Sequence, residues 1–173
     1  LAETLKSHGD EMGVRPIEVD YDMGAAVDRS RFISEKLTKG IGFLFKKNGV
    51  EHVVGTGRIS APGKVEVTPA EGDPHTLEAK NIVIATGAVM KSFPGFEIDG
   101  EKVIGSREAL ALRSPPERMV VVGAGYVGVE FADVFNAFGV DVTLVEALDS
   151  VVPLADAEIG KTLARSFKKR GMT

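Results

Sequence analysis

The sequence predicts an α/β fold, and three observations lead to this prediction. The apolar run at residues 119–122 predicts a buried parallel strand, and a glycine-rich turn, a helical apolar repeat and a second strand follow it. Residues 51–80 predict an antiparallel β ribbon with turn residues between its strands. The apolar run at residues 81–85 then predicts another buried strand that ends in a turn.

The glycine-rich turn is a complete G-x-G-x-x-G motif between the strand and the helix. Gly123 permits a tight turn, and Gly125 has no side chain to keep a pyrophosphate from the backbone. Gly128 lets the helix and the strand approach closely. The free N–H groups and the positive dipole end of the helix would then bind the anion. We therefore predict a dinucleotide site at this turn.

The second strand, at residues 140–145, ends in an acidic residue, Glu146. It follows Gly123 at close to the spacing of about 20 residues expected for a ribose-binding acid. A carboxylate accepts hydrogen bonds from ribose hydroxyls and repels a 2′-phosphate, so it favours NAD over NADP. A glycine-rich turn without a ligand is the alternative, but strand, turn, helix, strand and acid occur here in the required order. The predicted NAD-binding residues are Gly123, Ala124, Gly125, Tyr126, Val127, Gly128, Val129, Glu130 and Glu146.

Composition limits the other classes of function. Of the 173 residues, 43% are apolar and 27% are charged, which is typical of a soluble protein with a core. A net charge of −4 gives no basic surface for nucleic acid, and no apolar run is long enough to suggest a membrane span. The absence of cysteine excludes disulfides, thiolate metal sites and thiol catalysis within these residues. The scattered histidines and acid pairs are interpreted as surface or helix-start residues: His8, His52, His75, Asp20/Asp22 and Asp156/Glu158.

Hydrophobic periodicity predicts the remaining elements in chain order. They are a helix end at residues 1–13, an extended connector at 14–21, a helix at 28–48, ribbon strands at 51–59, 64–67 and 76–80, and an amphipathic helix at 156–169. We place a linker near residues 90–117 and expect two parts, residues 1–117 and residues 118–173. Because the first helix has no cap and the second sheet is unfinished, we expect an internal segment of a longer polypeptide.

Several separated stretches resemble one family. They are LTKGIGFLFKKNGVEHVVGTGRISAPGKVEV, KNIVIATGA, SFPGFEIDG, EALAL and PERMVVVGAGYVGVEFADVFNAFGVDVTLVEALDSVVP. In this order they resemble the flavin-dependent pyridine nucleotide–disulfide oxidoreductases, and within these the dihydrolipoamide dehydrogenases. The resemblance implies two Rossmann-like dinucleotide-binding domains: part of an FAD domain with its antiparallel ribbon, then a truncated NAD domain.

The resemblance also assigns roles to residues. It implies that Gly57 and the turn of Thr86, Gly87 and Ala88 contact FAD; the alternatives are a strand bulge at Gly57 and a plain strand-end turn at the other three. The acid at the position of Glu130 lies near the flavin and pairs with a lysine in the family; a favourable interaction with the helix dipole is compatible with this role. Tyr126 departs from the lipoamide-acting members, which more often have an aliphatic residue there, and resembles a tyrosine that gates the nicotinamide pocket in glutathione reductase-like members.

The implied reaction passes electrons from a dihydrolipoyl dithiol to a protein disulfide and through FAD to NAD⁺. The family's redox cysteines and His–Glu pair lie outside this sequence, so we name no catalytic residue here and expect the segment alone to be inactive. Implied partners are a small-molecule or lipoyl-domain dithiol, a second copy in a homodimer and a 2-oxo acid dehydrogenase complex, in the bacterial cytoplasm or mitochondrial matrix. Two alternatives stay open: another reductase or transhydrogenase of the same superfamily, and a non-catalytic nucleotide-binding module.

Overall fold

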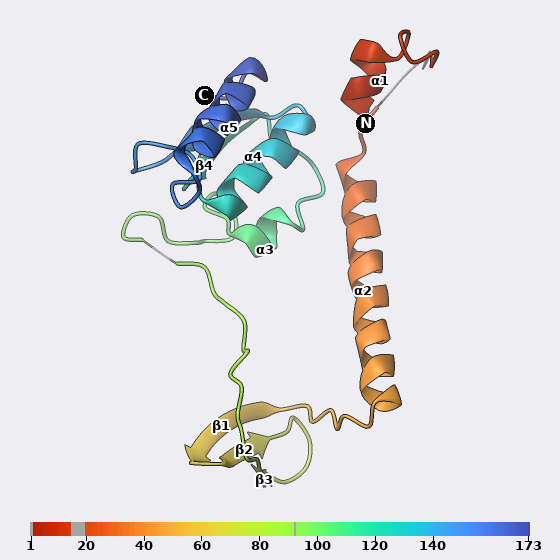
Figure 1. The fold of residues 1–173 in the computed structure, drawn as a ribbon, viewed down its shortest axis with the longest axis vertical. Coiled ribbons are helices and arrows are strands. Elements are labelled where there is room, and N and C mark those ends of the chain that lie inside the picture. Colours follow the sequence, from red (N-terminus) through yellow and green to blue (C-terminus); the bar gives the residue numbers. More distant parts are fainter. Residues whose placement is uncertain (1, 15–19, 92) are drawn as a thin grey trace. The chain divides into compact units, whose positions relative to one another are not determined.

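The computed structural model describes residues 2–14, 20–91 and 93–173, and Figure 1 shows the elements in chain order. The chain divides into two compact units. We call Leu1–Arg29 together with Glu108–Thr173 the nucleotide unit, and Ser30–Arg107 the ribbon unit. The division expected from the sequence, between residues 117 and 118, stays a prediction. Each unit is described by itself.

The ribbon unit contains the predicted antiparallel ribbon. Its strands are β1 (Thr56–Ala61), β2 (Lys64–Thr68) and β3 (His75–Glu78), in the order β1-β2-β3. Gly57 pairs with Val67 in a regular ladder, and the register shift lies between Ile59 and Ala61. The ribbon prediction is therefore confirmed, whereas the alternative of a bulge at Gly57 is wrong.

The nucleotide unit contains the predicted β-turn-α-β arrangement. Strand β4 (Arg118–Val122) lies parallel to β5 (Asp141–Val145), and helix α4 (Tyr126–Ala137) connects them. Helix α5 (Ala157–Lys169) follows, and Asp156 caps its first turn by accepting a hydrogen bond from the Glu158 N–H at 2.9 Å. Gly139, with φ of 87°, ends α4, as the sequence predicts.

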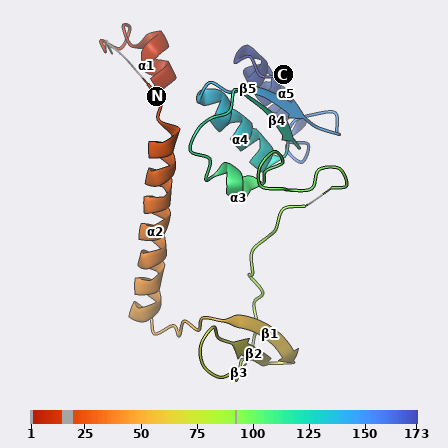
Figure 2. The ribbon, with the colours of Figure 1, turned by 180° about the vertical axis from the view of Figure 1, so that it is seen from behind.

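One face of the strand pair carries the core. Met119 pairs with Val142 and Val121 with Leu144, and all four face the helices. Figures 1 and 2 show α4 and α5 next to the two strands. Phe135 of α4, only 1% exposed, lies in this core. The side chains buried there share an apolar character and include Ala132, Val142, Val152, Phe167 and Met172.

The opposite face of the strand pair is uncovered, which corrects the prediction of a fully buried strand. Val120 is 63% exposed, Val122 is 55% exposed and Val145 is 47% exposed. A parallel strand is buried on both faces only where elements cover both sides, and α4 and α5 cover one side. Ile159 of the amphipathic helix α5 is likewise exposed.

The helix predicted at residues 28–48 is α2 (Met23–Lys47), which starts earlier than predicted. Asp22 accepts a hydrogen bond from the Ala25 N–H at 2.8 Å, an N-terminal cap that confirms its interpretation as a helix-start acid. Met23 is buried in the core of the nucleotide unit, a contact that the sequence did not predict. Helices α1 (Ala2–His8) and α3 (Ser106–Ala109) are short. The connector predicted at residues 14–21 falls largely on residues 15–19, which lie outside the described residues.

The strand predicted at residues 81–85 is absent from the structure. This segment is irregular, with Val83 87% exposed and Ile84 72% exposed. An apolar run becomes a buried parallel strand only when neighbouring strands bond to its backbone and other layers cover it. Within the described residues, the two sheets are β1-β2-β3 and β4-β5, and neither includes this segment. The prediction was wrong for this chain because it assumed partner strands.

Candidate dinucleotide-binding site

The turn between β4 and α4 has the conformation that its glycines make possible. Gly123 has φ of 99°, a left-handed region that side chains disfavour, and its N–H donates to the Val145 carbonyl oxygen at 2.8 Å. This bond continues the strand pairing to the first residue of the turn. The turn therefore starts where β4 and β5 end together, at their carboxyl edge.

Gly128 brings α4 close to the turn. A Cβ atom built on this residue would lie 1.9 Å from the Gly123 carbonyl oxygen, a distance at which the backbone must shift. The third glycine of the motif is therefore required for packing, as predicted. Its role here is structural and does not depend on a bound ligand.

Gly125 is the N-cap of α4 and leaves the helix N-terminus open. No side chain caps the first turn, and a Cβ atom at Gly125 would meet nothing within 4 Å. The first N–H groups of a helix have no partner inside the helix, so this end can accept an anion. The side chains of Tyr126 and Val127 are each 57% exposed beside it, whereas Val129 is buried. Glu130 is exposed on the next part of the helix.

Glu146 reaches back to the turn. Its Oε2 accepts a hydrogen bond from the Ala124 N–H at 2.7 Å, and its Oε1 accepts one from the Leu148 N–H at 3.0 Å. The N–H groups of Leu148 and Ala124 hold the pKa of the Glu146 carboxyl below its ordinary value of 4.5. The carboxylate is therefore charged at neutral pH and lies beside the glycine-rich turn.

A residue that sequence reasoning missed also holds this turn. The Val152 N–H donates to the Ala124 carbonyl oxygen at 2.7 Å, and both side chains are buried. Val152 resembles any apolar loop residue in the sequence, so no motif identifies it. The hydrogen bond depends on the path of the loop after β5, which the sequence pattern does not specify.

The predicted FAD residues lie in the ribbon unit. Gly57 is exposed in the β1–β2 ladder, while Thr86, Gly87 and Ala88 are exposed in the irregular segment after β3. Gly87 has φ of 86°, consistent with a turn at this position. The backbone at these residues is accessible, but their assignment to FAD stays a prediction.

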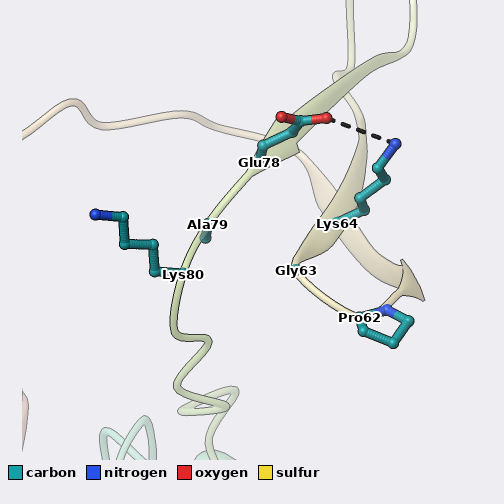
Figure 3. A pocket seen from close by; sticks show the side chains of 6 residues that line it. All are labelled: Pro62, Gly63, Lys64, Glu78, Ala79 and Lys80. Carbon is teal, nitrogen blue, oxygen red and sulfur yellow. Dashed lines mark ion pairs between the residues drawn. The ribbon is translucent and has the colours of Figure 1, made fainter.

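The ribbon unit has an open hollow of about 340 Å³ at the end of the ribbon. Figure 3 shows its lining, with Lys64 paired to Glu78 at 3.5 Å and Lys80 pointing away from that pair. None of the predicted cofactor residues lines it. The hollow therefore adds nothing to the FAD prediction.

Among residues 2–14, 20–91 and 93–173, no cluster of three or more histidine, cysteine, aspartate or glutamate side chains is arranged to hold a metal ion. Within the same ranges, no helix combines the length and the apolar character needed to cross a membrane.

Comparison with known proteins assigns the chain to a family. Residues 4–173 match the family described as pyridine nucleotide-disulphide oxidoreductase. The chain belongs to this family. The family implies the use of FAD and of NAD or NADP, and the resemblance inferred from the sequence is confirmed.

Individual members of the family match along nearly the whole chain. The dihydrolipoyl dehydrogenase of Chlorobaculum parvum is 43% identical over 169 residues, which cover 98% of this chain and 36% of that protein. The mitochondrial dihydrolipoyl dehydrogenase of Pisum sativum is 42% identical over 160 residues, which cover 92% of this chain and 32% of that protein. The chain thus spans about a third of the length of these relatives.

The fold is also found in a solved structure. The crystal structure of LpdA from Mycobacterium tuberculosis matches with a TM-score of 0.84 and 29% sequence identity. The match covers 99% of this chain and 38% of that one. The predicted α/β class with Rossmann-like units is therefore confirmed.

Proposed function

We propose that this chain is part of a dihydrolipoyl dehydrogenase that oxidises a dihydrolipoyl dithiol with NAD⁺. Its share would be the NAD-binding turn and part of the FAD site. The observation that supports this most is the charged Glu146 carboxylate held 2.7 Å from the backbone of the glycine-rich turn. Similarity to dihydrolipoyl dehydrogenases along nearly the whole chain supports the choice of substrate.

The nucleotide unit would bind NAD through its backbone and one carboxylate. The open N-terminus of α4, beginning at Gly125, would hold the pyrophosphate, with residues 123–130 lining the path of the dinucleotide. Each Glu146 oxygen accepts one backbone N–H and retains a lone pair for a ribose hydroxyl. The negative charge would repel the 2′-phosphate of NADP, so we propose NAD as the cofactor.

The ribbon unit would supply part of the FAD site. Gly57, Thr86, Gly87 and Ala88 offer exposed backbone groups, and Glu130 of α4 would lie near the flavin. When bound, FAD and NAD supply the electron-transfer chemistry, while the protein orients them. The chain contains no cysteine, so the redox disulfide and the acid–base groups would come from the rest of a longer protein.

The proposed partners follow from this reaction. The substrate would be a free dithiol or a lipoyl domain, and the enzyme would act as a homodimer within a 2-oxo acid dehydrogenase complex. Bacterial cytoplasm or mitochondrial matrix would be the compartment, in keeping with the bacterial and mitochondrial relatives.

The direct test uses the full-length protein that contains this chain. Purified with FAD, it should form NADH when mixed with dihydrolipoamide and NAD⁺. A control reaction should offer glutathione disulfide with NADPH. Turnover in the control and none with dihydrolipoamide would overturn the assignment of substrate.

A second candidate is another reductase of the same superfamily, and one observation favours it. Tyr126 stands at the start of α4 with its side chain 57% exposed, where lipoamide-acting members more often have an aliphatic residue. Replacing Glu146 with arginine should shift the cofactor preference toward NADP. Unchanged discrimination between NAD and NADP would refute the ribose role of Glu146 under either candidate.

A further inference from the structure

One residue of the nucleotide unit has a backbone conformation that its side chain disfavours. Among the described residues other than glycine, Val152 has a positive φ, 44°. A β-branched side chain makes this left-handed region a genuine outlier. Pro153 follows directly, and a residue before proline is normally extended. Such strain persists only where the surrounding structure over-determines the conformation.

The surroundings of Val152 do hold it in place. Its side chain is 5% exposed and belongs to the same core as Ala124. Its carbonyl oxygen accepts a hydrogen bond from the Ala155 N–H at 2.8 Å. Helix α5 lies against the preceding residue, because a Cβ atom at Gly160 would be 2.8 Å from the Val151 carbonyl oxygen. The left-handed conformation is therefore fixed from several sides.

This conformation directs one N–H group at the dinucleotide turn. The Val152 N–H donates to the Ala124 carbonyl oxygen at 2.7 Å, while the Ala124 N–H donates to Glu146 Oε2 at the same distance. The segment from Glu146 to Val152 thus holds Ala124 by its N–H group and by its carbonyl group. The carbonyl of Ala124 belongs to the peptide that carries the N–H of Gly125, the N-cap of α4.

We propose that Val152 is a positioning residue for the dinucleotide. Its strained backbone fixes the peptide between Ala124 and Gly125, so that the N–H groups at the start of α4 are oriented before the pyrophosphate arrives. Orientation in advance increases affinity, because a turn that populates the competent geometry only part of the time binds more weakly in proportion. This inference rests on the proposed function, since it concerns the site where NAD is proposed to bind.

Two substitutions at this position shorten the side chain similarly but differ in backbone freedom. Val152→Gly and Val152→Ala both remove the buried branches, but glycine adopts φ near 44° freely and alanine does not. We expect Val152→Ala to relax and lose the bond to Ala124, raising the Kd for NADH about tenfold. We expect Val152→Gly to keep the bond and to stay within about threefold of the unmodified protein.

The experiment titrates the FAD-loaded full-length protein with NADH and measures KM for NAD⁺ and for dihydrolipoamide. The positioning role predicts weaker NADH binding for alanine than for glycine, with FAD content and the KM for dihydrolipoamide unchanged. Leu154→Gly, in the same loop and 87% exposed, is the matched control and should bind NADH normally.

The outcomes separate a failure of the positioning role from a failure of the proposed function. A packing role alone would make glycine equal to or weaker than alanine, because glycine removes more of the buried side chain, and that order would overturn the inference. Equal NADH affinity of the unmodified protein, Val152→Ala and Val152→Gly would also overturn it. If the unmodified FAD-loaded protein failed to bind NADH, the proposed function itself would fall, and the inference with it.

Discussion

Two apolar segments of the same chain, each predicted to be a buried strand, differ in their outcome. Residues 118–122 form β4, paired along its length with β5 and covered on one face by helices. Residues 81–85 form no strand and leave Val83 and Ile84 largely exposed. Residues 119–122 are Met-Val-Val-Val and residues 82–84 are Ile-Val-Ile, so both runs are apolar. The composition of the segments therefore does not explain the difference.

The difference lies in where each segment finds its partners. The partners of β4 come within the next 50 residues, in α4, β5 and α5. The segment at residues 81–85 has no neighbouring strand among the described residues. A parallel strand gains stability from pairing and from covering layers, and its own sequence cannot supply either. The nucleotide unit is thus paired and packed on one face around its turn, whereas residues 81–85 of the second predicted cofactor region are not.

The largest expected difference is between an apolar substitution in the nucleotide unit and one in residues 81–85. Phe135→Ala removes a ring that is 1% exposed and should lower the free energy of unfolding by about 3–5 kcal/mol. Ile84→Ala, at a side chain 72% exposed, should change it by less than about 0.5 kcal/mol. Urea unfolding monitored by circular dichroism measures both. Similar losses for the two variants would show that residues 81–85 are packed.

A pair of glycine substitutions in the turn separates folding from binding. Gly128→Ala brings a methyl group against the Gly123 carbonyl oxygen and should cost about 1–3 kcal/mol of stability. Gly125→Ala meets open space and should leave the melting temperature nearly unchanged while weakening NADH binding. Thermal unfolding and NADH titration measure the two effects. An equal loss of stability in both variants would contradict the geometry described here.

The cap of α5 is expected to have a smaller effect. Asp156→Ala removes the acceptor for the Glu158 N–H and should cost about 1 kcal/mol, whereas Asp156→Asn keeps an acceptor and should cost less. The melting temperatures of both variants provide the measurement. No difference between alanine and asparagine would mean that the cap contributes nothing to the nucleotide unit.

The smallest expected effect is on the pH dependence of the turn. Backbone N–H groups hold the pKa of Glu146 below 4.5, so its contribution is fully present above that value. The contribution should be lost as the pH falls through the lower pKa of the folded protein. Unfolding free energies of the unmodified chain and Glu146→Gln, compared between about pH 6 and about pH 3, should therefore converge in acid. A constant difference over this range would exclude the charged carboxylate as its source.

The sequence predicted those parts of the fold that depend on local pattern. The order of strand, glycine turn, helix, strand and acid predicted the local geometry of the candidate site. Gly123 has a positive φ, Gly128 leaves no room for a Cβ atom, and Glu146 accepts a hydrogen bond from the turn. Turn residues such as Gly63 likewise indicated the ribbon. These predictions needed no knowledge of distant contacts.

The parts that could not be predicted depend on long-range contacts. Met23 enters the core of the nucleotide unit from a helix far away in the sequence. Val152 holds Ala124 through a loop path that no residue pattern encodes. The exposure of Ile84 depends on the lack of a partner strand, which the apolar run itself does not reveal.

Hydrogen–deuterium exchange of the 173-residue chain tests the central comparison most directly. The amides of β4, α4 and β5 should exchange slowly, because they are bonded within a packed unit. The amides of residues 81–88 should exchange at nearly the rate of an unfolded chain. Equal protection of the two regions, or fast exchange throughout the β4–α4–β5 segment, would contradict the claim that the first segment is packed and the second is not.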